Sequence, residues 1–261
     1  MIHVAIISHG HEDLLISSQL GGLLDAQDDL HLWIKDNQPS ARLKAYCLQH
    51  GISYTNASPG LGFGANNNFL FRQIQNSVGL KVKDVFVVMN PDIAIEPAVL
   101  RQLVHDMQQD AFPLATLNLY KDHEFTTPDA NVRLFPDWLS PLRMAIVKSL
   151  TQPYDKSRLP ATTHVDWASG AFLAFDAAHY EQLQGFDDRY FMYFEDVDIC
   201  YRSYLKLGKG VRYYPHLKAV HFAAHKNRSV LSPHANWFIR SFLKFLSRKY
   251  FVYSRPVPGS Y

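Results

Sequence analysis

No stretch of about 18 apolar residues occurs in the 261-residue chain, so the sequence predicts no membrane-spanning helix. The first residues, MIHVAIISHG, lack both the charged segment and the long apolar stretch of a secretory signal, and we expect none. Two cysteines, Cys47 and Cys200, are too few for a disulfide scaffold or a zinc knuckle and favour a reducing compartment. With 47% hydrophobic and 19% charged residues, the chain can bury a core as one large domain or two small ones.

Carboxylates are absent from the last quarter of the chain, where Asp198 is the final acidic residue. Residues 1–198 hold 14 Lys and Arg against 24 Asp and Glu, a net charge of −10, whereas residues 199–261 hold 12 against none, a net charge of +12. The two values sum to the overall charge of +2. A segment this basic predicts an anionic partner, which could be phosphate, nucleic acid or a membrane surface.

Strand-like and helix-like segments alternate over the first 120 residues. This alternation predicts an α/β fold in which a mostly parallel sheet carries helices on both faces. The expected strands are 2–8, 30–35, 52–57, 84–89 and 113–119. The expected helices are about 12–24, 40–50, 69–77 and 97–109.

Polar or glycine-rich sequence follows four of these strands, at 8–11, 36–38, 59–68 and 90–92. Ligands of such sheets bind beyond the carboxyl ends of the strands. The clustering therefore predicts a binding site at this edge of the sheet.

Residues 120–163 are irregular and contain five prolines, so we expect an inserted or substrate-facing segment there. Regular structure is expected again at 165–175, 177–184 and 195–207, followed by strands at 211–214 and 219–222. 

A last helix is predicted at 235–251, with Arg240, Lys244 and Arg248 on one side and an aromatic face on the other. Such a helix suits an anionic bilayer interface. The alternative is a terminal helix that packs its apolar face on the domain, and both can hold in part.

The run Gly60–Ala65 formally fits the G-x-G-x-x-G/A dinucleotide pattern, but it follows the third strand where that fingerprint follows the first. Two interpretations remain, a tight turn or a loop whose backbone approaches a bound nucleotide or sugar. In the second interpretation the amides of Asn66, Asn67 and Asn68 would serve as donors and acceptors.

Two acidic motifs could carry chemistry. Asn90-Pro91-Asp92 ends a buried strand, where a carboxylate can bind a divalent cation or can only cap the next helix. Glu195-Asp196-Val197-Asp198 follows four large apolar or aromatic residues, which can raise a carboxyl pKa toward that of a general base. The helix N-terminus opposes that shift, and an ordinary acidic first turn is the alternative.

His221 and His225 have the spacing of a zinc-protease helix but lack its glutamate, so that function is excluded. A single histidine at a strand end can complete a metal site. His225, Lys226 and Arg228 would suit diphosphate oxygens, unless they form a solvated basic loop.

Taken together, these motifs resemble family 2 inverting glycosyltransferases of the GT-A fold, and within them the bacterial dTDP-rhamnosyltransferases of O-antigen and cell-wall assembly. The motifs that carry the resemblance are ISHGH, Asp36-Asn37, GFGANNN, MNPDI, VDWASGAF, GFDDRYFMYFEDVDICYR and HFAAHKNRS. They run in family order from residue 6 to residue 229.

The resemblance implies that Asp196 is the general base, with Glu195 beside it, and that Asp92 and His221 bind Mg²⁺ or Mn²⁺. The motif that binds the metal in the family has Asn90 at its first position here, which leaves one carboxylate fewer. The substrate-binding residues that it implies are Ser8, His9, Asp36, Asn37, Gly62, Phe63, Gly64, Asn67, Asn90, Trp167, Ser169, Gly170 and Arg228.

The resemblance also implies a catalytic domain at 1–230, with a nucleotide-sugar half (1–119) and an acceptor half (120–230), followed by a membrane-associating segment at 231–261. The expected reaction moves L-rhamnose from dTDP-β-L-rhamnose to a lipid-diphosphate-linked saccharide at the inner face of the bacterial cytoplasmic membrane. A UDP-galactofuranose or other UDP-hexose donor, and a non-catalytic nucleotide-sugar or lipid-binding protein, stay open as alternatives. A nucleotidyltransferase is a further alternative, but it would carry its glycine-rich loop after the first strand, whereas the loop here follows the third. No nucleic-acid partner is expected, because the aromatic residues of the last helix lie opposite its cations. The oligomeric state is not predicted.

Overall fold

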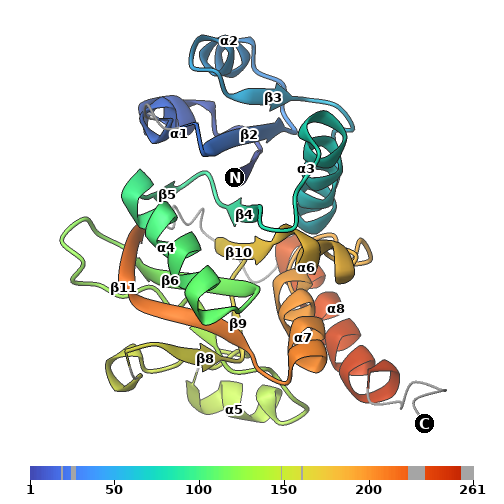
Figure 1. Ribbon diagram of the computed structural model, residues 1–261. Coiled ribbons are helices and arrows are strands. Elements are labelled where there is room, and N and C mark those ends of the chain that lie inside the picture. Colours follow the sequence, from blue (N-terminus) through green and yellow to red (C-terminus); the bar gives the residue numbers. More distant parts are fainter. Residues whose placement is uncertain (19, 25–27, 148, 160, 223–232, 254–261) are drawn as a thin grey trace, which may run out of the picture.

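A computed structural model of the chain describes residues 1–18, 20–24, 28–147, 149–159, 161–222 and 233–253 (Figure 1). Helices surround a central sheet. The helical segments are α1 (Glu12–Ser17), η1 (Leu20–Leu23), α2 (Ala41–Gln49), α3 (Phe63–Val78), α4 (Pro97–Asp110), α5 (Ser140–Val147), η2 (Lys156–Arg158), α6 (Ala177–Gln182), α7 (Glu195–Leu207), α8 (Pro233–Ser247) and the π-helical η3 (Arg248–Val252). The strands are β1 (Ile2–Ser8), β2 (Leu30–Asp36), β3 (Ser53–Thr55), β4 (Val85–Met89), β5 (Ile93–Ala94), β6 (Leu114–Tyr120), β7 (Val132–Arg133), β8 (Thr163–Val165), β9 (Trp167–Ala168), β10 (Phe172–Asp176) and β11 (Val211–His221).

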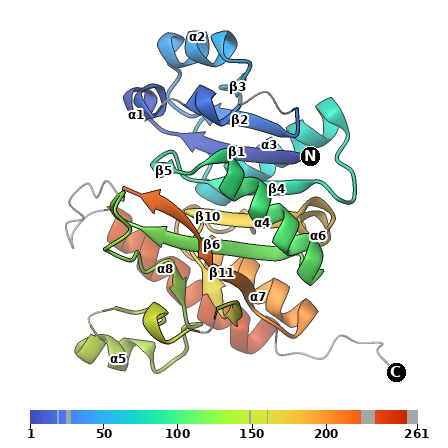
Figure 2. The ribbon, with the colours of Figure 1, turned by 60° about the vertical axis from the view of Figure 1, so that its left-hand side comes forward.

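The central sheet has the strand order β3-β2-β1-β4-β10-β6-β11-β5, with β8 beside β11. Figure 2 shows the strands from β3 to β6 following this order down the molecule. The pairs among β3, β2, β1 and β4 are parallel, as is β6 with β11, whereas β10, β5 and β8 pair with their neighbours in antiparallel fashion. The mostly parallel sheet predicted from the sequence is therefore confirmed, with antiparallel β10 inserted between its two parallel parts.

Helices cover both faces of the sheet, as predicted, and each face has its own hydrophobic core. The alternation of side chains along a strand sends Val4 and Ile6 of β1 to one core and Ala5 to the other. Apolar residues of α1, α2 and α4 fill the first core, and those of α3, α6, α7 and α8 fill the second.

Two segments differ from the sequence-based expectation. Residues 165–175 form parts of three short strands, because the chain turns at Asp166 and again at Ser169–Ala171. The two strands expected at 211–214 and 219–222 are one strand, β11, whose pairing with β6 shifts register between Tyr214 and Lys218.

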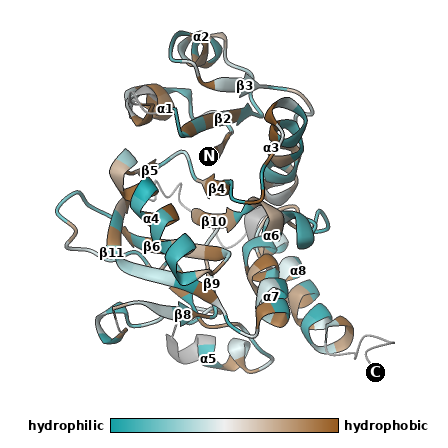
Figure 3. Cartoon of the chain, in the orientation of Figure 1, coloured by the Kyte–Doolittle hydropathy of each residue, from teal (hydrophilic) through white to brown (hydrophobic). Residues whose placement is uncertain are grey.

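The predicted amphipathic helix near the C-terminus exists as α8 and η3, and Figure 3 shows hydrophobic and hydrophilic bands alternating along α8. Phe242, Phe245 and Leu246 are buried in the second core, next to Phe194. The alternative in which this helix packs on the domain is thus correct for one of its faces. Within the described residues no helix is both long enough and apolar enough to cross a bilayer.

Candidate active site

The carboxyl edge of the parallel strands gathers several of the predicted residues. Ser8 ends β1 and pairs in register with Asp36, the last residue of β2. Both side chains are buried, and the Ser8 hydroxyl has no hydrogen-bond partner among the described residues. Asn90, directly after β4, donates its backbone N–H to Ala171 O at 2.9 Å. The edge therefore has the arrangement that the sequence predicted.

Asp36 shapes the turn that follows β2. Its Oδ2 accepts hydrogen bonds from the Ser40 N–H and the Tyr54 hydroxyl, both at 3.1 Å. Asn37 accepts a bond from the buried Lys35 ammonium at 2.9 Å, and His9 lies exposed with its Nε2 3.0 Å from the Gln38 amide. These contacts fix the turn, and a role of the residues in binding a nucleotide stays a prediction.

The glycine-rich segment is shorter as a loop than expected, because α3 already begins at Phe63. A Cβ on Gly62 would lie 2.2 Å from Phe191 O, and one on Gly64 would lie 2.6 Å from Phe186 Cβ. The close approach that requires glycine at these two positions is thus made by the protein's own 186–191 segment.

The expectation of a loop through residue 68 was wrong, because the three asparagines lie inside α3. Asn66 and Asn67 donate their amide N–H groups to Leu61 O at 2.8 Å and Phe63 O at 3.0 Å. Asn68 bonds Phe186 O at 2.8 Å and so joins α3 to the segment before the acidic motif. All three are buried, and we assign Asn68 to holding the 186–191 segment in place.

Asp196 lies in the first turn of α7, where it meets the segment 167–170. Its Oδ2 accepts a hydrogen bond from the Gly170 N–H at 3.0 Å, and its Oδ1 accepts one from the Val197 N–H at 2.8 Å. A Cβ on Gly170 would lie 2.8 Å from Phe63 Cε1, so Phe63, Gly170 and Asp196 converge.

Other contacts hold the rest of this segment. Trp167 is buried and donates its indole N–H to Leu134 O at 2.9 Å. The Ser169 N–H donates to Asn131 O at 2.8 Å. The segment 167–170 therefore lies between β7 and the start of α7.

The two carboxyl groups of the Glu195–Asp196 pair differ in their surroundings. Burial raises the pKa of Glu195 well above its usual value, the nearby Asp196 charge raises it further, and Glu195 Oε2 has no hydrogen-bond partner in the described chain. Burial also raises the pKa of Asp196, but hydrogen bonds from Gly170 and Val197 and the charge of Arg133 oppose the shift. Glu195 therefore favours the neutral acid, and Asp196 is the half-buried carboxylate suited to accept a proton.

The aromatic residues that precede this pair pack on α8. Phe191 contacts Trp237, with ring centroids 5.1 Å apart, and Tyr193 contacts Phe238 at 5.5 Å. Phe191 is still 45% exposed, so it contributes less to the burial of the site than the sequence suggested.

Asp92 and His221 lie side by side because the two-residue strand β5 pairs Ile93 with His221. The distance from Asp92 Oδ1 to His221 Nε2 is 3.4 Å. On the other side of the ring, His221 Nδ1 lies 2.6 Å from Asp129 Oδ2. Burial lowers the pKa of His221, but the hydrogen bonds and charges of Asp129 and Asp92 outweigh it and raise the pKa to about 9.

Asp92 and His221 together fit a divalent cation that also binds a diphosphate. One carboxylate and one imidazole supply two ligands, and Mg²⁺ or Mn²⁺ takes the others from phosphate oxygens and water. Asp129 holds the ring nitrogen that faces away from Asp92, as outer carboxylates do for metal-binding histidines. No group of three or more His, Cys, Asp or Glu residues in the described part of the chain is arranged to hold a metal alone.

The structure adds two residues that the sequence did not single out, Asp129 and Arg133. Arg133 donates to Ala130 O at 2.8 Å and to Thr151 O at 2.6 Å, and its charge acts on both Asp129 and Asp196. Both residues fall in the segment 120–163, where no strand end or motif marked them. The predicted diphosphate contact Arg228, with His225 and Lys226, lies outside the described residues.

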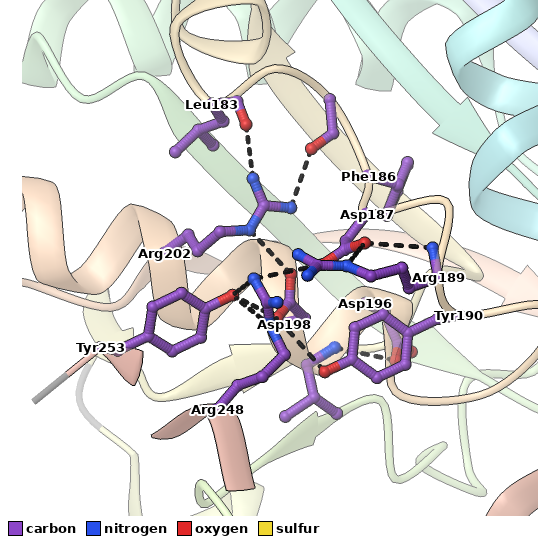
Figure 4. Close-up of polar contacts among 12 residues, drawn as sticks. Leu183, Phe186, Asp187, Arg189, Tyr190, Asp196, Asp198, Arg202, Arg248 and Tyr253 are labelled. Carbon is purple, nitrogen blue, oxygen red and sulfur yellow. Dashed lines mark hydrogen bonds and ion pairs between the residues drawn. The ribbon is translucent and has the colours of Figure 1, made fainter. Parts of the chain in front are cut away.

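The third carboxylate of the acidic motif, Asp198, has a structural role (Figure 4). It is buried and accepts hydrogen bonds from Arg202 Nε and from the Tyr253 hydroxyl, both at 2.7 Å. Arg248 lies 3.6 Å from the same carboxylate and 3.2 Å from Asp187. This network joins the end of η3 to the first turn of α7, two residues from Asp196.

Comparison with known proteins shows one relative that matches nearly the whole chain and others that match about two thirds to three quarters of it. The chain is 32% identical over 260 residues to rhamnosyltransferase WbbL of Escherichia coli (strain K12), which covers 98% of the chain and 96% of that protein. It is 28% identical over 208 residues to an N-acetylglucosaminyl-diphospho-decaprenol L-rhamnosyltransferase of Mycobacterium tuberculosis (strain ATCC 25618 / H37Rv), covering 73% of the chain and 64% of that protein. No family model matches the chain.

Solved structures share the fold. GalNAc-T7, crystallised with UDP, GalNAc and Mn²⁺, matches with a TM-score of 0.65 and 11% identity over 93% of this chain and 47% of its own. The mannosyltransferase PcManGT of Pyrobaculum calidifontis, in complex with GDP-Man and Mn²⁺, matches with a TM-score of 0.55 and 12% identity over 87% of this chain and 58% of its own. At such identities the likeness concerns the fold alone.

Proposed function

The chain belongs to the family 2 rhamnosyltransferases of the GT-A fold, and from this premise we propose that it transfers L-rhamnose from dTDP-β-L-rhamnose to a sugar hydroxyl of a polyprenyl-diphosphate-linked saccharide. The acceptor class is that of the Mycobacterium tuberculosis relative, an N-acetylglucosaminyl-diphospho-decaprenol L-rhamnosyltransferase, and O-antigen assembly is the proposed setting. The observation that carries the proposal is the Asp196 carboxylate, which two backbone N–H groups hold and on which Arg133 acts, as it also acts on Asp129 beside His221.

In the proposed reaction a single displacement inverts the anomeric carbon. The acceptor hydroxyl oxygen forms the new bond to that carbon as the bond to the donor's diphosphate oxygen breaks. Asp196 takes the hydroxyl proton, and the raised pKa of Glu195 disfavours a second negative charge next to it. No protein nucleophile is needed, because one attack from the opposite face gives inversion directly.

The leaving dTDP gathers negative charge on its diphosphate. Asp92 and His221 would hold a Mg²⁺ or Mn²⁺ ion at the strand edge, and such an ion stabilises that charge when it is bound. Asp129 keeps the His221 ring in the required orientation, and Arg133 contributes a fixed positive charge on the acceptor side.

The localisation follows from the acceptor. A polyprenyl-linked saccharide stays in the membrane, so we place the enzyme peripherally at the inner face of the cytoplasmic membrane, with residues 231–261 as the associating segment. The excess of cations after Asp198 supports an anionic lipid surface as the partner.

Asp196→Asn tests the assignment of the base. The change keeps the size of the side chain and removes its proton affinity, so kcat for rhamnose transfer should fall by about 10²–10⁴. Transfer from dTDP-rhamnose to a short-chain lipid-diphosphate GlcNAc is followed by mass spectrometry, with Glu181→Gln on α6 as the matched carboxylate control. Near-normal turnover of Asp196→Asn would remove Asp196 from this role, and transfer from UDP-galactofuranose or another UDP-hexose in place of dTDP-rhamnose would overturn the donor.

A further inference from the structure

Exposed apolar side chains collect on two segments, one at α5 and the other at η3. At α5, Leu139 is 60% exposed and Leu142 71% exposed. At η3, Phe251 is 60% exposed and Val252 51% exposed. Large apolar groups on a protein surface mark an interaction site when they are contiguous.

The two segments are in contact. The ring of Trp138, directly before α5, stacks on that of Tyr250 in η3 with centroids 5.7 Å apart and an interplanar angle of 26°. Lys249 donates a hydrogen bond to Pro136 O at 2.9 Å and so fastens η3 to the same segment. We call the surface formed by Trp138, Leu139, Leu142, Tyr250, Phe251 and Val252 the α5–η3 surface. In Figure 1 it lies at the end of the molecule opposite α2.

Charge argues for a lipid occupant. The chain has no carboxylate after Asp198, and the nearby Asp137 is neutralised by an ion pair with Arg143. Arg240 on α8 is exposed. The segment η3 belongs to residues 199–261, whose net charge of +12 attracts anionic headgroups. Trp and Tyr at its centre are the side chains that favour the boundary between headgroups and acyl chains.

The cationic stripe predicted for the last helix does not supply this attraction alone. Arg248 is engaged with Asp187, Asp198 and Tyr253 inside the protein. Lys244 donates a hydrogen bond to Arg189 O. Since these cations are used internally, apolar contact has to provide much of the membrane affinity.

The surface is connected to the site through the strands β7 and β9. A small hollow next to α5 is lined by Leu134, Phe135, Leu150 and Arg143. Leu134 directly follows Arg133 of β7, and β7 pairs with β9, which leads into the segment 167–170 that contacts Asp196. A lipid-linked acceptor held at this surface would thus be one strand away from the base.

We propose that the α5–η3 surface inserts into the headgroup–acyl boundary of an anionic bilayer and presents the lipid-linked acceptor to the site. The proposal rests on the proposed function for the identity of the acceptor, but membrane binding can be measured without it. The proposal gives α5 the same role in membrane binding as the C-terminal helix, although the sequence did not connect α5 with membranes.

The test is vesicle flotation of the full chain with phosphatidylglycerol–phosphatidylcholine vesicles. The double variant Leu139→Ser/Leu142→Ser changes exposed side chains, so it should fold normally and lower the vesicle partition coefficient at least 10-fold. The matched control Leu48→Ser/Val82→Ser changes side chains that are 83% and 78% exposed elsewhere, and should bind as the unaltered chain does. Binding of the unaltered chain should survive 0.5 M NaCl in part, because an apolar component is not screened.

Three outcomes would overturn the proposal: no vesicle binding by the unaltered chain, equal binding by the α5 double variant, or a dimer in sedimentation velocity that the double variant dissociates.

Measurements of activity separate this proposal from the proposed function. The double variant should keep transfer to a water-soluble short-chain acceptor and lose at least 10-fold with an acceptor embedded in vesicles. If no chain transfers rhamnose to either acceptor while vesicle binding follows the variants, the proposed function fails and the membrane surface stands.

Discussion

His221 contacts a carboxylate on each side of its ring. The carboxylate at Nδ1, that of Asp129, fixes the orientation of the ring. Asp129 Oδ2 lies 2.6 Å from Nδ1, which leaves Nε2 directed at Asp92. An imidazole fixed in this way loses no ring rotation when it binds a metal ion, and binding displaces the proton from Nε2. Asp129 is therefore a positioning residue for the proposed metal site.

Asp129→Ala should lower the affinity of the enzyme for Mn²⁺ in the presence of dTDP by about 10–100-fold, the range for losing such a partner. Asp129→Asn keeps an acceptor for the ring and should lose less. Titration calorimetry measures the affinity directly, and Glu124→Gln, an exposed change in the same segment, is the control. An unchanged Mn²⁺ affinity in Asp129→Ala would show that the ring is held in other ways.

Single residues were predictable from the sequence where they stand at the end of a strand or the start of a helix. Asp92 and Asp196 could be named because periodicity marked β4 and α7 beside them. Asp129 could not, because its place next to His221 depends on a contact across 92 positions of the chain. Gly62 was noticed for the right reason, close backbone approach, but the partner proved to be Phe191.

Among the elements, α7 matched its predicted bounds, since acidic residues begin it and Gly208 ends it in the left-handed region at φ 71°. For the last helix, the predicted apolar face is correct. The predicted cationic stripe is wrong in part, because two of its three cations contact the protein itself. The sequence shows that Arg248 and Asp198 carry opposite charges, but not that they meet, because η3 reaches α7 only through the packing of α8 on α7.

The Tyr253 hydroxyl contributes to the tie between η3 and α7. Tyr253 donates to Asp198 at 2.7 Å and accepts from Arg248 Nη2 at 2.7 Å. Tyr253→Phe removes these two bonds and the bond from Arg248 Nε at 2.9 Å, and it leaves a buried carboxylate with fewer donors, so it should lower the free energy of unfolding by about 1–3 kcal/mol. Urea unfolding measures the loss, and Tyr204→Phe on the exposed side of α7 is the control. Amide exchange in 248–252 should rise as well, and equal exchange in the two variants would contradict the tie.

At the scale of the whole molecule, the sequence predicted the parallel sheet and its helices but not the antiparallel β10. Buried parallel strands appear as continuous apolar runs, and β1 and β4 do so. The direction of β10 is set by where the chain returns after the irregular segment, which no local pattern encodes. Two buried histidines, one in the sheet and one in a helix, should make the stability of this fold sensitive to acid.

His3 in β1 and His179 in α6 are buried, and burial lowers the pKa of each from 6.5 to about 4. A histidine whose folded pKa is depressed stabilises the fold fully above pH 6.5, and the contribution is lost as the pH falls from 6.5 toward 4. At pH 5 each should cost about 2 kcal/mol relative to pH 7.5. Urea unfolding at the two pH values should therefore show a large loss for the unaltered chain and a smaller loss for His3→Gln and for His179→Gln. The exposed His50→Gln should leave the loss unchanged, and an equal loss in all four proteins would show that carboxylates alone set the acid sensitivity.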